Sequence, residues 1–406
     1  MGICFECRDE NQQRTCQLPF APQVRSPRSP GIIIVGAGPA GLAAATKLRD
    51  LGLSFTVLDD NPTAGGQIWR GDLARTQTLG SDLITGTRVI SIDAEARTLL
   101  LEDAERAYQL PYTKLILATG SRELFLPFPG WTLPGVFGAG GLQALVKSGL
   151  DVQGKRVIIG GTGPLLLAVA ALLRKKGADV RLIAEQAPLA SLSTFAKALL
   201  RRPAKLLQGA GLGWTLAGIP YRTSTWVTQA HGDESLEAVT LNTGHTEPCD
   251  YAAIGCGLVP NDELAQLAGT SPHILTAQTG DVDLATLAGT AAACRAAGHP
   301  FNEAPLTDAR AFDAALRQAF TLRPELRNLA APDTFVCRCE DVAYSRLTPW
   351  TSFRAAKLQT RCGMGPCQGR VCGPAVRFLF GWTDTSVRPP AFPARIATLA
   401  KTEGDL

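Results

Sequence analysis

Residues 31–45, which read GIIIVGAGPAGLAAA, decide the fold of this chain. The apolar run at 32–35 predicts a buried strand, and the alanine-rich run after the glycines predicts a helix. Gly36 permits the tight turn between them, Gly38 lets the backbone approach a pyrophosphate, and Gly41 lets the helix pack closely on the strand. The first turn of such a helix offers free N–H groups and a positive dipole end to phosphates.

The residues that follow complete the pattern. A second apolar strand at 55–58 ends in Asp59, whose carboxylate can accept hydrogen bonds from ribose hydroxyls. Strand, glycine turn, helix, strand and acid, in this order, predict a dinucleotide-binding unit. The alternative is a glycine-rich turn that serves packing alone.

The same order recurs once. A strand at 156–159, a glycine turn at 160–164, a helix at 165–176 and a strand at 180–184 lead to Glu185. We therefore predict an α/β fold with two Rossmann-like dinucleotide-binding domains in tandem.

The second turn keeps Gly161 and Gly163 but has Leu166 where the third glycine would stand, which predicts wider spacing of helix and strand. Glu185 favours a free ribose 2′-hydroxyl because a carboxylate repels a 2′-phosphate. Three alternatives stay open: the site takes NAD(H), takes another adenine nucleotide, or is an empty scaffold.

Cysteines cluster near the C-terminus, in CRCEDV at 337–342 and in RCGMGPCQGRVC at 361–372. Four thiolates can hold a [2Fe–2S] cluster, two for each iron. A zinc site and unliganded cysteines are the alternatives, although Cys-x-Cys is a short spacing for one tetrahedral ion.

The first motif, with LDDNPTAGGQIWR at 58–70 and LILATGS at 115–121, resembles the FAD-binding half of glutathione-reductase-like flavoproteins. The cysteine pairs of the disulfide-reductase branch are missing, which disfavours thiol–disulfide exchange. The resemblance implies a bound FAD, and it implies a set of cofactor-binding residues in the two nucleotide units. They are Gly36, Gly38, Pro39, Ala40, Gly41, Asp59, Gly66, Gln67, Arg70, Val89, Thr119, Gly120 and Asp281 for FAD, and Gly161, Gly163 and Glu185 for the second nucleotide.

The C-terminal words CRCEDV, AAKLQTRCGMGPCQGRVCGP (355–374) and SVRPPAFPAR (386–395) resemble a more specific family. It comprises the flavoprotein subunits of opine oxidase, D-hydroxyproline dehydrogenase and hydrogen cyanide synthase. This part is also similar to the small helical [2Fe–2S] domain of bacterioferritin-associated ferredoxin. The resemblance assigns the metal to Cys337, Cys339, Cys367 and Cys372, and Cys362 is a fifth thiol that could replace one of them.

The family resemblance implies an electron-transfer subunit of a multi-subunit amine or amino-acid dehydrogenase. Its expected partners are an amine-oxidising flavoprotein subunit and a small ferredoxin-like subunit, so we expect a hetero-oligomer. No catalytic residue is identified, because no substrate-recognition constellation is evident. The alternatives are a self-contained NAD(P)H-dependent reductase that feeds the cluster and a non-catalytic assembly subunit.

The N-terminal Cys4, Cys7 and Cys16 resemble the end of a plant-type [2Fe–2S] motif that lacks its first cysteine. Residues 1–30 are therefore expected to be a ferredoxin-like remnant and a linker, and the alternative is unliganded cysteines in a loose arm. We assign 31–138 and 250–300 to the FAD domain, 139–249 to an NAD-binding-like domain, 301–380 to the cluster domain and 381–406 to a tail. The FAD domain departs from the family in being shorter within 69–89 and within 269–281.

Composition sets the remaining limits. The 406 residues carry a net charge of +4, a surplus that gives no case for nucleic-acid or membrane-surface binding. The uncharged apolar stretch 157–173 is too short for a bilayer and is broken by glycines and a proline. No secretion signal opens the sequence, and clustered cysteines suit a reducing compartment, so we expect a cytoplasmic protein.

Overall fold

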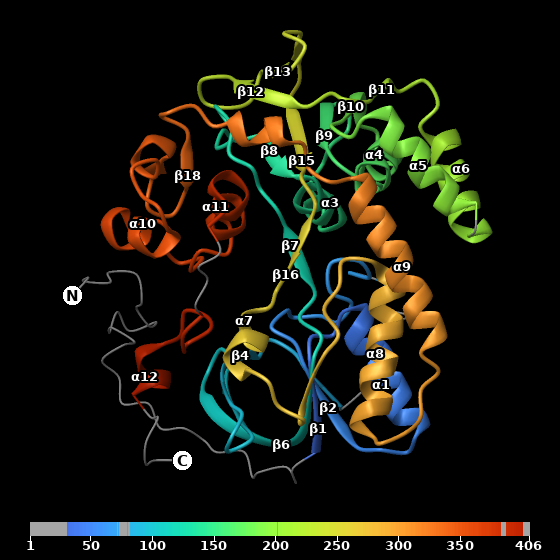
Figure 1. The fold of residues 1–406 in the computed structure, drawn as a ribbon, viewed down its shortest axis with the longest axis vertical. Helices are drawn as coiled ribbons and strands as arrows, with labels where there is room; N and C mark the ends of the chain where they lie inside the picture. The colour runs from blue at the N-terminus through green and yellow to red at the C-terminus, as the bar shows by residue number, and fades with distance from the viewer. Residues whose placement is uncertain are drawn as a thin grey trace. The chain divides into compact units, whose positions relative to one another are not determined.

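A computed structural model describes residues 31–70, 72, 79, 82–200, 202–382 and 387–400 (Figure 1). Cys4, Cys7 and Cys16, and the predicted ferredoxin-like remnant with them, lie outside the described residues. The chain forms two compact units. The first takes its described residues from Met1–Gly120, Pro260–Glu303 and Ser386–Leu406, and the second takes them from Ser121–Val259 and Ala304–Thr385.

The first unit is built on a sheet in which parallel strands carry the glycine motif. Its parallel strands are β3 (Leu83–Ile84), β2 (Phe55–Leu58), β1 (Gly31–Val35), β6 (Ala107–Leu117) and β17 (Ile274–Thr276). Helices α1 (Pro39–Asp50) and α8 (Val282–Ala296) pack against each other in this unit, as Figure 1 shows. They approach so closely that a Cβ on Gly289 would stand 2.0 Å from the Ala40 carbonyl oxygen.

An antiparallel extension grows from the N-terminal half of β6. β5 (Thr98–Glu102) pairs with β6, and β4 (Arg88–Asp93) pairs with β5. Helix α7 (Glu263–Ala268) packs on β4, and the short helix α12 (Ile396–Leu399) belongs to the same unit. The apolar residues that alternate along β5 close a buried cluster with those of β6.

The second unit repeats the parallel arrangement. Its main sheet has the order β11-β10-β9-β15-β8, and every pairing in it is parallel. The strands are β8 (Val136–Gly138), β9 (Arg156–Gly161), β10 (Asp179–Glu185), β11 (Tyr221–Arg222) and β15 (Tyr251–Gly255). The helices are α3 (Ala139–Lys147), α4 (Leu165–Lys175), α5 (Leu189–Leu199) and α6 (Pro203–Thr215). The two Rossmann-like units that the sequence predicts are therefore confirmed.

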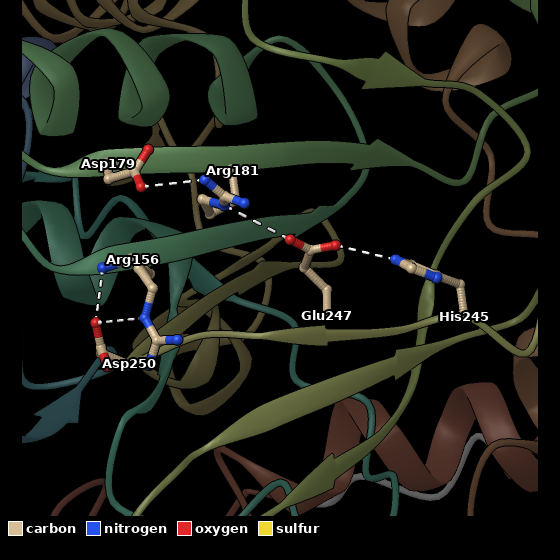
Figure 2. Close-up of polar contacts among 6 residues, drawn as sticks. All are labelled: Arg156, Asp179, Arg181, His245, Glu247 and Asp250. Carbon is tan, nitrogen blue, oxygen red and sulfur yellow. Dashed lines mark hydrogen bonds and ion pairs between the residues drawn. The ribbon is translucent and has the colours of Figure 1, made fainter.

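A small antiparallel sheet joins the second unit. It consists of β12 (Val227–His231), β13 (Ala238–Leu241) and β14 (Thr246–Pro248), and the pair β7 (Ser121–Glu123) and β16 (Leu258–Pro260) forms separately. Ion pairs tie β14 and the start of β15 to the main sheet, as Figure 2 shows. Arg156 lies 2.8 Å from Asp250, and Arg181 lies 3.6 Å from Glu247.

The C-terminal part of the second unit is mostly helical. It contains α9 (Ala304–Ala319), a 3-10 turn (Pro324–Asn328), β18 (Phe335–Cys337), β19 (Val342–Ala343), a second 3-10 turn (Tyr344–Arg346), α10 (Phe353–Thr360) and α11 (Cys372–Phe380). Buried Val336, Phe353 and Val376 form a core together with three buried cysteines. In the part of the chain that the structure describes, no helix has the length and apolar character to cross a membrane.

Candidate functional site

The first glycine loop lies at the carboxyl edge of the first sheet, directly after β1. Gly36 has φ of 104°, and a Cβ there would stand 2.3 Å from the Ala118 carbonyl oxygen. A Cβ on Gly41 would stand 1.8 Å from the Gly36 carbonyl oxygen. Neither position admits a side chain, because real atoms do not approach so closely. These two glycines therefore have the turning and packing roles that the sequence predicts.

Gly38 has a different environment. The nearest atom to a Cβ placed on it is the Gly66 Cα, at 4.0 Å, so the space above this backbone is open. Gly66 itself has φ of 58° and approaches Gly38 from the facing loop. No described side chain caps the N-terminus of α1, where Pro39 and Ala40 form the first turn. An open backbone beside uncapped N–H groups fits a pyrophosphate.

Asp59 lies at the end of β2 and is 6% exposed. Its Oδ2 accepts a hydrogen bond of 2.6 Å from the backbone N–H of Ala37. Its Oδ1 accepts bonds of 2.8 Å from the backbone and the side-chain amide of Asn61. The carboxylate therefore fixes the glycine loop on the second strand. A carboxylate oxygen has two lone pairs, so Oδ2 could accept from one more donor, such as a ribose hydroxyl.

The ends of β6 and β17 meet at Thr119. Its hydroxyl donates to the Asn261 carbonyl oxygen at 2.6 Å and accepts from the Gln278 side-chain amide at 2.6 Å. Asn261 in turn donates to the Thr119 carbonyl oxygen at 2.9 Å. Sequence reasoning missed Asn261 and Gln278, since single amides in loops carry no motif. Thr119 and Gly120 thus belong to a hydrogen-bonded floor beside the glycine loop.

The other residues that the resemblance assigns to FAD lie in varied surroundings. Gln67 is exposed and Arg70 is half-buried in the loop after β2. The Val89 side chain is 3% exposed and packs in the core of the antiparallel extension. Asp281 caps α8, because its Oδ1 accepts from the Leu284 backbone N–H at 2.9 Å. Their contacts with a cofactor remain predictions.

The second glycine loop follows β9 and has equally tight backbone packing. Gly161 has φ of 134°, and a Cβ there would stand 2.0 Å from the Gly255 carbonyl oxygen. The Leu166 side chain fits because Gly255 leaves room for it, 3.3 Å from a Cβ at that position. Glu185 is fully buried and accepts 2.8 Å bonds from the backbone N–H groups of Gly163 and Ala187. Burial raises the pKa of the Glu185 carboxyl group above its ordinary value.

The segment that follows α9 lies against this second loop. The Thr162 hydroxyl donates to the Phe320 carbonyl oxygen at 3.3 Å, and the Phe320 ring lies 3.9 Å from a Cβ placed on Gly163. Gln186 is 1% exposed, donates to the Thr321 carbonyl oxygen and accepts from the Arg323 backbone N–H at 3.1 Å. The position that a pyrophosphate would take is therefore next to the chain's own residues 320–323.

Three buried cysteines converge in the C-terminal part. The sulfur atoms of Cys337, Cys362 and Cys372 all lie within 4.8 Å of one another. Cys337 ends β18, Cys362 is the second residue after α10, and Cys372 is the first residue of α11. Hydrogen bonds from the Cys362 and Cys372 thiols lower the pKa of Cys337 to about 2, and those with Cys337 raise the pKa of Cys362 to about 12.

Two further cysteines lie beside this group. Cys339 is exposed and Cys367 is half-buried, and their thiols share a hydrogen bond. A hydrogen bond from Cys372 lowers the pKa of Cys367 to about 5, so this thiol is linked to the buried group. A Cβ on Gly365 would stand 2.3 Å from the Cys339 Cβ, so the loop that contains Gly365 packs closely against Cys339. The group of three thiols contains one lowered pKa, that of Cys337, and the group of two contains another, that of Cys367. Converging thiols of this kind fit a soft metal such as iron or zinc.

The structure thus gathers Cys362 with two of the four predicted ligands, Cys337 and Cys372, and it keeps Cys339 with Cys367. The sequence marks Cys362 only as a fifth thiol. Sequence spacing alone cannot decide whether Cys362 joins the group, because the turn at 361–372 determines which sulfur faces inward.

Comparison with known proteins agrees with this architecture. The family model of pyridine nucleotide-disulphide oxidoreductases matches residues 30–274. Hydrogen cyanide synthase subunit HcnB of Pseudomonas aeruginosa is 31% identical over 89% of this chain and 96% of its own length. An opine oxidase subunit of Rhizobium meliloti is 30% identical over 91% of this chain and 98% of its own.

A solved structure is similar over most of the chain. L-proline dehydrogenase from P. horikoshii superposes with a TM-score of 0.67 at 18% identity, covering 92% of this chain and 79% of the other. At that identity the likeness shows the fold.

Proposed function

Since the chain belongs to the pyridine nucleotide-disulphide oxidoreductase family, it is an FAD-dependent oxidoreductase, and we propose that it is the electron-transfer subunit of a multi-subunit amine or amino-acid dehydrogenase. Relatives that match over almost their whole length are named as subunits of hydrogen cyanide synthase and opine oxidase. The name of the second supports an opine as the substrate class of the assembly, and the family resemblance adds D-hydroxyproline or glycine.

The first unit supplies the flavin site in this proposal. The open backbone at Gly38, the uncapped start of α1 and the spare acceptor on Asp59 would hold the pyrophosphate and ribose of FAD. The loop with Gly66 and Gln67 and the Thr119 floor would border the rest of the cofactor. The proposed flavin domain is 31–138 with 250–300, followed by a nucleotide-like domain at 139–249.

The cysteine group supplies the second redox site, in a proposed cluster domain at 301–380. Cys337, Cys339, Cys367 and Cys372 would bind a [2Fe–2S] cluster, and Cys362 is placed to replace one of them. When bound, a flavin exchanges electrons in pairs or singly and such a cluster exchanges them one at a time. Hydrogen bonds from neighbouring thiols lower the pKa of Cys337 and of Cys367, and three of the five cysteines, Cys337, Cys362 and Cys372, are buried.

One observation supports a partner subunit as the source of the electrons, namely the contact of residues 320–323 with the second glycine loop. A reductase that uses NAD(P)H needs open backbone at this loop and an acid that can reach a ribose. Here residues 320–323 lie beside the loop, since Thr162 donates to the Phe320 carbonyl oxygen and Gln186 accepts from the Arg323 backbone N–H. Glu185 is fully buried, with its oxygens bonded to backbone N–H groups. We therefore assign electron input to a partner subunit that oxidises the amine, with a small ferredoxin-like subunit as a further partner in the cytoplasm.

The test is anaerobic reduction of the purified chain and of its complex. We expect NADH to leave the flavin absorbance of the isolated chain unchanged, and the amine substrate to bleach it only when the oxidising subunit is present. Rapid bleaching of the isolated chain by NADH would establish the self-contained reductase instead.

A second measurement distinguishes an electron-transfer role of the chain from a role in assembly alone. Replacement of Cys372 by Ser should abolish amine-dependent turnover with an external acceptor, while the matched change Cys294→Ala, at a buried cysteine outside the cluster, should leave it intact. Full turnover of Cys372→Ser would mean that the chain only holds the assembly together.

A further inference from the structure

Helices α5 and α6 carry exposed apolar side chains at the edge of the second unit (Figure 1). Leu189, Leu200 and Leu207 are 68%, 69% and 73% exposed, Leu206 is 42% exposed and Trp214 is 87% exposed. We call these five residues the α5–α6 face. A fully exposed Trp beside four exposed Leu is an unusual surface for a helix pair, because such residues normally face a core.

The arrangement along α6 shows that this exposure is systematic. Leu206, Leu207 and Trp214 fall on one side of a helix of 3.6 residues per turn, and Leu207 and Trp214 lie two turns apart. The buried Leu216, just after the helix, lies towards the opposite side. Helix α6 therefore presents an apolar stripe to solvent.

Helix α6 also has a low intrinsic helix propensity. Gly209, Gly211 and Gly213 occupy its second half, and each has open space where a Cβ would be. Glycine is among the least favourable residues inside a helix, and here no close packing requires it. A helix of this composition gains stability from a contact on its outer side.

Charge identifies the contact. Residues 186–232 contain no Asp or Glu, while Lys197, Arg202 and Lys205 are all basic. Lys197 is exposed on α5, and Arg202 is paired with Asp308 of α9. The small net charge of the whole chain hides this local asymmetry. Asp308 offsets one of these charges, and the segment 186–232, which has basic residues and no acid of its own, complements the anionic headgroups of a bilayer.

We propose that the α5–α6 face binds the surface of an anionic membrane, with α6 lying in the plane of the interface. Leu206 and Leu207 enter the boundary between headgroups and acyl chains, and Trp214 sits at headgroup depth, where its amphipathic ring is favoured. Lys197 lies beside the phosphates. The inference is independent of the proposed redox function, since no residue of the face touches the glycine loops or the cysteine group.

The test uses the purified full-length chain and vesicles of phosphatidylcholine alone or mixed with phosphatidylglycerol. We expect co-sedimentation with the mixed vesicles, weaker binding to neutral ones, and weakening by salt. Trp214 serves as a reporter: its emission should shift to shorter wavelength with vesicles, and the shift should vanish in Trp214→Phe.

The decisive variant is Leu207→Gln with Trp214→Gln. In the proposed complex these two side chains are buried in the bilayer, so their replacement should weaken partitioning into vesicles by more than about tenfold. The matched control is Leu358→Gln, on α10, where the leucine is 63% exposed and outside the face; its partitioning should be unchanged. Thermal unfolding and flavin content should match the parent in both, which excludes misfolding.

Two outcomes would overturn the proposal. One is equal binding of the parent and the double variant to mixed vesicles. The other is a double variant that fails to assemble with its oxidising subunit while it still binds vesicles, which would make the face a protein interface.

Discussion

The Glu185 carboxylate accepts a hydrogen bond of 2.8 Å from the backbone N–H of Gly163, twenty-two positions earlier in the chain. In the first unit Asp59 accepts from Ala37 across the same separation. In each unit the acid that ends the second strand holds the glycine loop at the end of the first. The second loop also has residues 320–323 beside it, since the Thr162 hydroxyl donates to the Phe320 carbonyl oxygen.

The open space above Gly38 gives a variant that separates binding from folding. Gly38→Ala adds a methyl group that meets no atom closer than 4.0 Å, so the melting temperature should stay within about 2 °C of the parent. The same methyl group would occupy the approach to a pyrophosphate, and flavin retention should fall at least about tenfold. Fluorescence titration of apoprotein with FAD measures it.

Gly41→Ala is the contrasting change. Its Cβ would stand 1.8 Å from the Gly36 carbonyl oxygen, so α1 must move away from β1. We expect the free energy of unfolding to fall by about 2–4 kcal/mol, as for overpacking in a core, with flavin loss as a consequence. Equal stability of the two variants in urea would contradict this distinction.

Iron analysis can decide which sulfurs bind the cluster. Cys337→Ser and Cys372→Ser should lose most of their iron and labile sulfide, because both thiols belong to the predicted ligand set and to the converged group. If Cys339 is a ligand, Cys339→Ser also loses iron and Cys362→Ser keeps it. The reverse result would exchange Cys362 for Cys339. The control Cys294→Ala should keep its iron.

Gln186 offers a test of how the second loop is closed. Its amide donates to Thr162 and Thr321 and accepts from the Arg323 backbone N–H, and only 1% of it is exposed. Gln186→Leu leaves these groups without their partner, which should cost about 1–3 kcal/mol of unfolding free energy. Hydrogen exchange at residues 320–323 should accelerate, whereas Gln229→Leu, at an exposed position in β12, should change neither quantity.

Acid stability should depend on Asp250. Hydrogen bonds from Arg156 lower the pKa of the Asp250 carboxyl group below its ordinary value of 3.8. A carboxyl group with a lowered folded-state pKa stabilises the protein above its unfolded-state pKa, and this contribution disappears as the pH falls through the folded-state pKa.

The parent should therefore lose more stability than Asp250→Asn between about pH 5 and pH 2. At neutral pH the variant should melt about 1–2 °C lower, since the ion pair is largely exposed. Asp233→Asn, at an exposed acid of the same unit, should follow the parent at every pH. Melting curves across this range measure the difference.

Much of the fold follows from local sequence rules. The strand predicted at 55–58 is β2, and the helix predicted from 165 is α4, which ends at Lys175. Apolar period, glycine turns and the terminal acids are all short-range signals, so they can be identified in a single sequence.

The remainder depends on contacts between distant residues. The link of Gln186 to Arg323 spans 137 positions, and that of Thr119 to Gln278 spans 159. Nothing in either neighbourhood marks these amides, because their roles arise only when the chain has folded. The Leu166 side chain likewise packs beside a residue of a distant strand, 3.3 Å from a Cβ built on Gly255.

The packing of α8 on α1 has a consequence for synthesis. Strand β17 and helix α8 are translated only after the whole of 121–259, yet they complete the sheet and the helix layer around the first glycine loop. In a nascent chain the first Rossmann motif therefore stays partly uncovered while residues 121–259 leave the ribosome. The helix layer beside the proposed flavin site is complete only once Gly289 packs against Ala40.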